Sequence, residues 1–170
     1  MNPPATVSVA CFKHEIWIRV EGRGSFQSSG GLRQFVQAMI RRGHRDFVID
    51  LGACEHMDST FMGTLTGISQ QLRELGQGSL RTLNVSSRNV SLLENLGLNL
   101  LFGVEEAGPV PKTPADPSVK LLPLPLPEGQ DQELILDAHE ALAATSAENR
   151  ERFRDVLDYL QKDSGSGSAA

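Results

Sequence analysis

The 170-residue sequence is poor in cysteine and in long apolar runs. Its two cysteines, Cys11 and Cys54, are too few to staple a small secreted domain, and they are not spaced as a C-x-x-C redox or zinc pair. No stretch reaches the ~18 apolar residues needed to span a bilayer. The first residues also lack the basic and apolar regions of a signal peptide. We therefore expect a cytoplasmic protein with no membrane insertion.

Positive charge is scarce as well, because 16 Lys and Arg stand against 21 Asp and Glu, a formal net charge of −5. Residues 128–163 hold ten acids and four bases, a balance of −6. The rest of the chain therefore carries 12 bases and 11 acids, a balance of +1. Binding to a phosphate backbone requires clustered positive charge. The composition thus gives no support for nucleic acid as a partner.

Catalytic motifs are missing too. The chain has no G-x-x-x-x-G-K-[ST] phosphate loop and no G-x-S-x-G nucleophile elbow. The nearest string is Gly63-Thr64-Leu65-Thr66-Gly67, which falls inside an expected helix, where small residues permit close packing. We expect no enzyme activity, no catalytic residues and no cofactor.

Cysteine and histidine offer only a weak case for a metal site. Cys54 and His56 flank one loop, and His44 could complete a zinc site with them. A buried Cys and a solvated loop His are the simpler interpretation, so no metal site is expected. His139 belongs to an acidic helix and is expected at the surface.

What the sequence does contain is an alternation of strand and helix patterns, which indicates an α/β fold. Two β-branched runs separated by three residues predict a hairpin, and Phe47-Val48-Ile49 reads as a buried strand. The expected strands cover 7–12, 16–20, 47–51 and 80–85, and the expected helices cover 32–40, 61–75 and 90–96.

The C-terminal third has a different character. Seven of the nine prolines lie between residues 109 and 127, which favours an extended linker. Two apolar stripes then predict an αα-hairpin, with Thr145-Ser146-Ala147-Glu148 as a capping box between its helices. The second stripe comprises Phe153, Val156, Leu157 and Leu160 and must pack on the α/β core or on another chain. We favour the core or a second copy of the same chain.

A short polar motif follows the buried strand. Asp50-Leu51 leads through a loop to Met57-Asp58-Ser59-Thr60, so that Asp58 or Ser59 caps the next helix. Asn84-Val85 and a segment from Leu92 to Phe102 follow in order. Together these elements resemble the STAS domain of anti-sigma factor antagonists, also called anti-anti-sigma factors. The resemblance gives the boundaries 5–105 for the STAS domain. Composition and periodicity give 106–129 for the linker, 130–163 for the acidic helical hairpin and 164–170 for a flexible tail.

The resemblance implies a mixed four- or five-stranded sheet with packed helices, and a bacterial regulator of transcription that acts by binding proteins. It places the phosphorylated serine of the family at Ser59, with Thr60 the less favoured alternative. The implied partners are an anti-sigma factor with serine kinase activity and a serine phosphatase. The apolar stripe of the C-terminal hairpin, and not the resemblance, adds a second copy of the chain as a candidate partner. The implied partner-binding residues are Asp58, Ser59, Thr60, Phe61 and Met62.

Many members of the family have Gly and Leu where this chain has Phe61 and Met62, so the partner could differ.

Two other interpretations stay open. The chain could be a STAS scaffold subunit of a lipid-transport or stress-signalling complex, in which Ser59 is only a helix cap. It could also be an enzyme that uses Asp58 with His56 as an acid–base pair, or a nucleotide hydrolase, although no supporting motif accompanies those residues.

Overall fold

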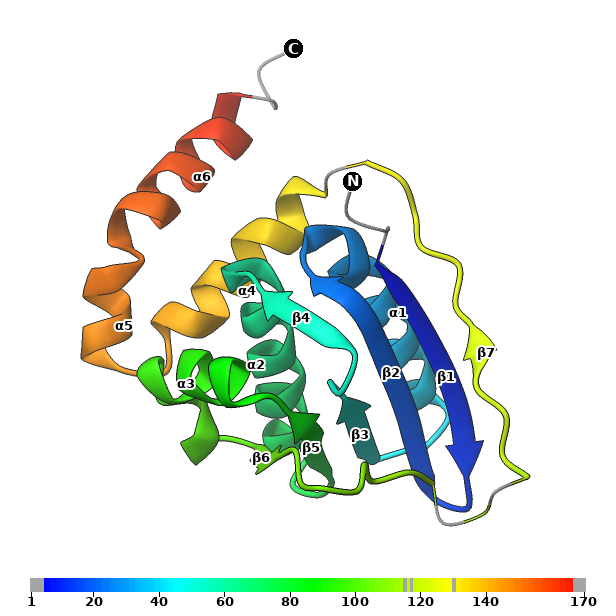
Figure 1. Cartoon of the computed structure of the whole chain (residues 1–170). Coiled ribbons are helices and arrows are strands. Elements are labelled where there is room, and N and C mark those ends of the chain that lie inside the picture. The colour runs from blue at the N-terminus through cyan, green and yellow to red at the C-terminus, as the bar shows by residue number, and fades with distance from the viewer. Residues whose placement is uncertain (1–4, 115, 117, 130, 167–170) are drawn as a thin grey trace.

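One mixed β-sheet runs through the protein and carries α1 and α2 on the same face, as the computed structural model shows (Figure 1). The structure describes residues 5–114, 116, 118–129 and 131–166. The strand order is β6-β5-β3-β2-β1-β7, and β4 pairs with the end of β2. The expected α/β fold with a mixed sheet and C-terminal helices is therefore confirmed.

The antiparallel part of the sheet is the predicted hairpin. Strands β1 (Thr6–Phe12) and β2 (Glu15–Gly24) pair in register from Thr6 with Glu21 to Phe12 with Glu15. Helix α1 (Phe26–Arg41) follows, and Ser25 caps it in a reciprocal box with Ser28. This box satisfies two backbone N–H groups that the first helical turn leaves free.

The parallel part of the sheet follows from the buried apolar runs. Strand β3 (Asp46–Asp50) lies between β2 and β5 (Ser79–Val85), and β6 (Gly103–Glu106) forms the edge. Helix α1 crosses over between the parallel strands β2 and β3, and the next crossover helices are α2 (Ser59–Glu74) and α3 (Ser87–Asn95). A short 3-10 helix, η1 (Leu98–Leu100), precedes β6.

Three short strands were not anticipated, and they bring the sheet to seven strands. They are β4 (Cys54–Met57), β6 and β7 (Leu122–Pro123). Runs of two to four residues are too short for a periodic pattern to reveal. Only pairing with a longer neighbour decides that they are strands.

The Pro-rich segment lies along the domain instead of crossing open solvent. Its strand β7 pairs with β1, and the Leu124 N–H donates to the carbonyl of Val7 at 2.7 Å. Proline lacks an N–H donor, so an edge strand is where a sheet tolerates it. Leu121 of the same segment covers an apolar cluster of Trp17, Val48 and Leu83 on the sheet face opposite α1 and α2.

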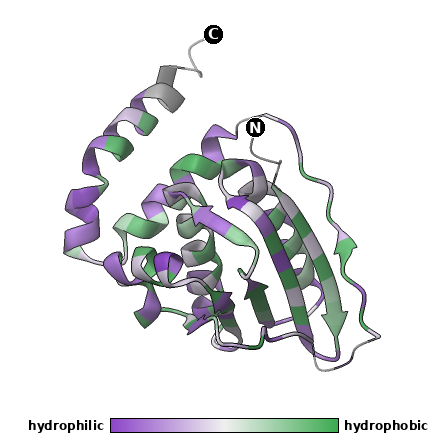
Figure 2. Cartoon of the chain, viewed as in Figure 1, coloured by the Kyte–Doolittle hydropathy of each residue, from purple (hydrophilic) through white to green (hydrophobic). Residues whose placement is uncertain are grey.

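The C-terminal segment forms three helices, α4 (Gln132–Ala143), α5 (Ala147–Arg152) and α6 (Arg154–Ser166). Helix α4 lies along α2, whereas α5 and α6 extend at the side of the molecule away from the hairpin strands (Figure 1). The residues of α5 and α6 are mostly hydrophilic (Figure 2). Helix α6 continues into the expected tail as far as Ser166, and residues 167–170 of that tail lie outside the described residues.

Candidate functional site

The start of helix α2 is fixed by the ends of two strands. Asp58 is the N-cap, and its carboxylate accepts the Phe61 N–H at 2.8 Å. The Asp58 N–H in turn donates to the carbonyl of Gly24, the last residue of β2, at 2.8 Å. A β-carbon on Gly24 would lie 2.8 Å from the Phe61 ring, so only glycine permits this close approach. The sequence left the choice of cap open, and the structure assigns it to Asp58.

Ser59 is the first residue of α2 and is half-buried. Its hydroxyl Oγ lies 2.8 Å from Nε2 of His139 in α4. The other ring nitrogen, Nδ1, lies 2.7 Å from the carbonyl oxygen of Ile135. A carbonyl can only accept, so Nδ1 carries a proton; in the neutral imidazole Nε2 is then the acceptor. In this neutral tautomer the Ser59 hydroxyl donates its hydrogen to Nε2 of His139.

His139 is only 5% exposed, so the expectation that it lies at the surface is wrong. Its ring meets Phe153 edge to face, with centroids 5.8 Å apart. His139 directly follows Ala138 on the face of α4 that meets α2. The spacing of Leu134, Ala138 and Leu142 could have marked this face, but it could not show that the face meets the start of α2.

Small residues let the backbones of α4 and α2 come into direct contact. A β-carbon on Gly63 would overlap the backbone carbonyl of Ala138, whereas one on Gly67 would make an ordinary 4.0 Å contact with Ala141. The close packing expected from Gly63-Thr64-Leu65-Thr66-Gly67 is therefore confirmed, and α4 is the element that uses it. Of the stripe expected to pack on the core or on another chain, Phe153 belongs to the main apolar cluster, as does Leu142 of α4. Val156 of the same stripe is 41% exposed, so docking on the protein's own core is observed for only part of the stripe.

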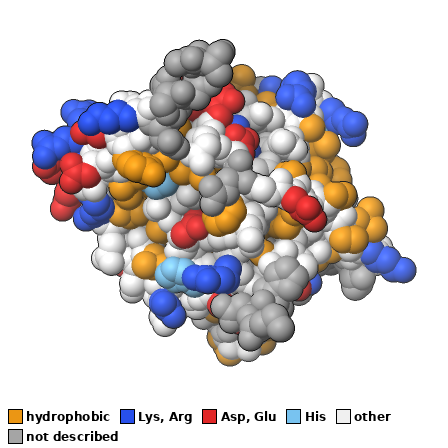
Figure 3. All heavy atoms as spheres, turned by 90° about the horizontal axis from the view of Figure 1, so that it is seen from above, with side chains coloured by type: hydrophobic (Ala, Val, Ile, Leu, Met, Phe, Trp, Pro, Cys, Tyr) orange, Lys and Arg blue, Asp and Glu red, His pale blue; other side chains and the backbone are white. Residues whose placement is uncertain are grey.

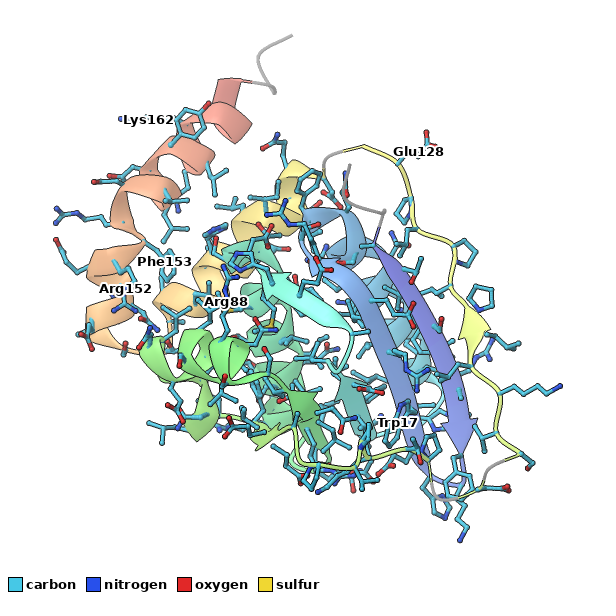
Figure 4. All side chains as sticks on the ribbon, in the orientation of Figure 1. Trp17, Arg88, Glu128, Arg152, Phe153 and Lys162 are labelled. Carbon is cyan, nitrogen blue, oxygen red and sulfur yellow. The ribbon has the colours of Figure 1, made fainter. Side chains whose placement is uncertain are left out.

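Polar contacts hold α5 against the end of α3. The Asn149 side chain is 2% exposed and donates to the carbonyl of Leu96 at 2.9 Å. Arg152 donates to the carbonyl of Asn95 at 3.1 Å. The last carbonyls of a helix have no partner within it, so these two side chains satisfy acceptors that α3 leaves free. Phe153 points from the break between α5 and α6 toward the body of the domain (Figure 4).

An open groove of about 600 Å³ lies beside Ser59, between α3 and α5. Its walls are apolar near α2 and charged near α5; they comprise Ser59, Met62, Leu92, Asn95, Leu96, Glu148, Arg152 and Phe153. Figure 3 shows charged side chains of both signs gathered at one side of the molecule, next to an apolar patch that includes a histidine. A phosphate on Ser59 would have to enter this groove, because His139 occupies the other side of the hydroxyl.

The other residues of the expected partner site lie deeper than Ser59. Phe61 is completely buried against Gly24, and Thr60 and Met62 are buried as well. Asp58 and Ser59 are the two of the five that keep partial exposure. A partner could contact Phe61 only if the start of α2 moved away from β2. Asp58 and Ser59 are the expected partner-binding residues that a partner can reach without such a movement.

The alternative chemistries find little support around the same loop. The Cys54 thiol donates to the carbonyl of His56 at 3.5 Å, and burial raises the pKa of Cys54, which disfavours the thiolate that binds zinc. The carboxylate of Asp58 is engaged in capping α2. Within the described ranges, no three His, Cys, Asp or Glu side chains lie close enough to hold a metal ion. Nor is any helix of that part long and apolar enough to cross a membrane.

Comparison with solved structures shows the same fold in proteins of low sequence similarity. A candidate anti-sigma factor antagonist of Thermotoga maritima, TM1081, is 13% identical with a TM-score of 0.52, and the match covers 63% of this chain and 87% of that one. The unphosphorylated anti-sigma factor antagonist SpoIIAA, known from Bacillus, is 17% identical with a TM-score of 0.50, over 60% of this chain and 89% of that one.

Comparison with curated proteins finds none that matches the chain significantly. The profile of the STAS domain, however, matches residues 7–112, which include every strand from β1 to β6 and the helices α1, α2 and α3. The match also contains Asp58 and Ser59 at the start of α2 and ends before the C-terminal helices begin. The chain belongs to the STAS domain family.

Proposed function

We propose that this protein is a phosphorylation-controlled binding switch of the anti-sigma factor antagonist type. With Ser59 unphosphorylated, it binds an anti-sigma factor that has serine kinase activity and so acts on transcription. Phosphorylation of Ser59 by that partner ends the binding, and a serine phosphatase restores it. The switch operates in the cytoplasm and has no catalytic residues of its own.

The observation that carries this proposal is the place of Ser59 as the first residue of α2, directly after the cap Asp58. The N-terminal end of a helix has free N–H groups and the positive end of the helix dipole, so it tolerates a phosphate without unfolding. The groove beside Ser59 gives such a group somewhere to lie. A phosphate adds about −1.5 to −2 charges. Next to Asp58 this charge would oppose docking of a partner by repulsion and by the cost of removing water.

Thr60 is the weaker candidate for the modified residue. Its side chain is 7% exposed, whereas Ser59 is half-buried and borders the open groove. A kinase must draw the hydroxyl into its own active site, which is easier for the first residue of a helix than for a buried one. Mass spectrometry of the protein recovered from its own cells should find phosphate on residue 59. Consistent localisation to Thr60 alone would overturn this assignment.

Paired substitutions test the switch itself. Ser59→Ala should bind the anti-sigma factor constitutively, and Ser59→Asp should bind at least tenfold more weakly while remaining folded. Ser87 is the matched control, because it is the exposed first residue of α3. Ser87→Ala and Ser87→Asp place the same changes at another helix start and should leave binding unchanged. Equal binding of the anti-sigma factor by Ser59→Ala and Ser59→Asp would contradict the proposed switch.

One observation favours a second function, that of a STAS scaffold. The hydroxyl of Ser59 already has a structural partner in the buried His139. In a scaffold this hydrogen bond would be the whole role of Ser59, and no phosphate would be found on it. The phosphosite mapping above separates the two functions, because a scaffold would carry no phosphate on Ser59. The Ser59→Asp binding measurement separates them as well, because a scaffold keeps its partners whatever the charge at residue 59.

A further inference from the structure

We propose that the C-terminal segment, residues 131–160, is a displaceable cover of the Ser59 face of α2. In this closed form α4 occupies the surface that a helical partner would use, and His139 holds the Ser59 hydroxyl. Partner binding then requires α4 to leave α2. The inference rests on the proposed function and adds to it the control of access to Ser59.

The first support is the fit between α2 and α4. Gly63 admits the backbone of another helix so closely that any side chain there would overlap the Ala138 carbonyl. Gly67 lies one turn further along and faces Ala141 at ordinary contact distance. Two small residues four apart make a flat strip that suits a helix with small residues of its own. A partner that takes the place of α4 must therefore present a helix with alanine or glycine opposite Gly63.

The second support is that the cover closes on Ser59 itself. The hydroxyl of Ser59 donates to His139, and Phe153 packs edge to face on the His139 ring. Met62, which lines the same groove as Ser59, is also buried in the closed form. Of the residues expected to meet a partner, Ser59 is thus engaged by α4, and Met62 shares a groove with Phe153.

The third support is the independence of the cover from the domain beneath it. The STAS match ends at residue 112, and the fold shared with the solved structures covers only 63% of this chain. The Pro-rich segment between residue 112 and α4 joins the two parts, and its composition favours up to ~3.1 Å per residue. A displaced α4 would therefore stay tethered nearby and could return. Beyond α2, the contacts of the cover with the domain include Leu134 beside Gly30 of α1 and the ion pair between Arg33 and Asp137 at 3.0 Å. Asn149 and Arg152 also donate to carbonyls at the end of α3.

Opening of the cover has a cost that makes the open form a minor one. Leu134, Leu142 and Phe153 would lose their buried positions. A partner helix must replace these contacts on α2, and the freed segment must shield its own apolar face. A partner therefore displaces α4 only if its contacts with α2 offset the free energy of opening.

Hydrogen exchange measures this opening on the whole chain, without any partner. In the wild type, amides of α4 should exchange at least tenfold faster than those of β3, because α4 opens without unfolding the sheet. Ala138→Leu places a large side chain against Gly63 and should raise α4 exchange at least tenfold further, with β3 unchanged. Ala144→Leu is the control, because Ala144 is the exposed C-cap of α4; it should match the wild type.

A binding measurement tests whether the uncovered face accepts a helix. The probe is a fluorescein-labelled peptide with the sequence of residues 131–162. It should bind the Ala138→Leu protein at least tenfold more tightly than the wild type, whose own cover competes with it. Ala144→Leu should again behave as the wild type.

Two results would overturn the cover. One is α4 exchanging as slowly as β3 in both the wild type and Ala138→Leu, which would make α4 a permanent part of the core. The other is equal peptide binding by the wild type and Ala138→Leu. Neither measurement involves phosphate or an anti-sigma factor. If α4 stayed closed while phosphate was found on Ser59, the cover alone would be refuted. If α4 opened but no phosphate was found on Ser59, the switch alone would be refuted.

Discussion

The backbone carbonyl of Ala138 in α4 lies directly over Gly63 in α2, so that no side chain fits between the two helices at this point. This contact joins the STAS domain to a segment outside the family match. It also sets the position of His139, the next residue of α4, whose ring reaches Ser59 one turn before Gly63. A single close approach between backbones thus determines what surrounds the candidate switch residue.

Gly63→Ala should destabilise the protein. Overpacking costs about 1–3 kcal/mol, and the better helix propensity of alanine returns up to about 1 kcal/mol. We expect the free energy of unfolding to fall by about 1–2 kcal/mol in urea denaturation. Gly67→Ala gains the same propensity and meets Ala141 at 4.0 Å, so its stability should be unchanged or higher. Equal effects of the two substitutions would contradict the packing of α4 on α2.

Asp58→Ala should cost about 0.5–2 kcal/mol of stability, because Asp58 and not Ser59 caps α2. Asp58→Asn keeps an oxygen that can accept the Phe61 N–H, so it should lie within a few tenths of a kcal/mol of the wild type. Thermal or urea unfolding of both variants measures the difference. If Asp58→Asn were as damaging as Asp58→Ala, the charge of Asp58 would matter more than its capping bond.

Ser59 and His139 should be energetically coupled. His139→Phe keeps an aromatic ring beside Phe153 but removes the hydrogen bond to Ser59, and Ser59→Ala removes the other partner. Each single change leaves a polar group without its partner, whereas the double change leaves none at this bond. A double-mutant cycle on the free energy of unfolding should therefore give a coupling of about 1 kcal/mol. Additive effects, within about 0.3 kcal/mol, would mean that the bond contributes nothing.

The two cysteines should differ sharply in reactivity. Cys11 is exposed, whereas Cys54 is buried, and burial raises the pKa of the Cys54 thiol. Because the thiolate is the reactive form, Cys54 has both less thiolate and less access at pH 8. A maleimide should modify Cys11 within minutes and leave Cys54 intact until denaturant is added. Peptide mass spectrometry identifies the modified residue. Rapid labelling of Cys54 in the native protein would show that the loop before α2 opens.

The elements of the STAS domain could be predicted from the sequence because each carries its own local pattern. The apolar run at Phe47-Val48-Ile49 is buried, and so are the residues of the predicted stripe from Phe61 to Leu72. Leu75, the last residue of that stripe, is 45% exposed. Asp58 and Ser59 could be recognised as a helix start for the same reason, since capping depends on residues a few positions apart. The close packing at Gly63 was also anticipated, although its partner was not.

Contacts between distant segments required the tertiary structure. Ser59 and His139 are eighty residues apart. Their hydrogen bond exists because the Pro-rich segment passes along the sheet edge and returns the chain to α2. Nothing local to His139 distinguishes it from a surface residue of an acidic helix. Periodicity can say that one face of a helix is buried, but only the packing of the whole chain decides which other surface that face meets. For this protein, that decision is what brings the C-terminal helices onto the candidate switch.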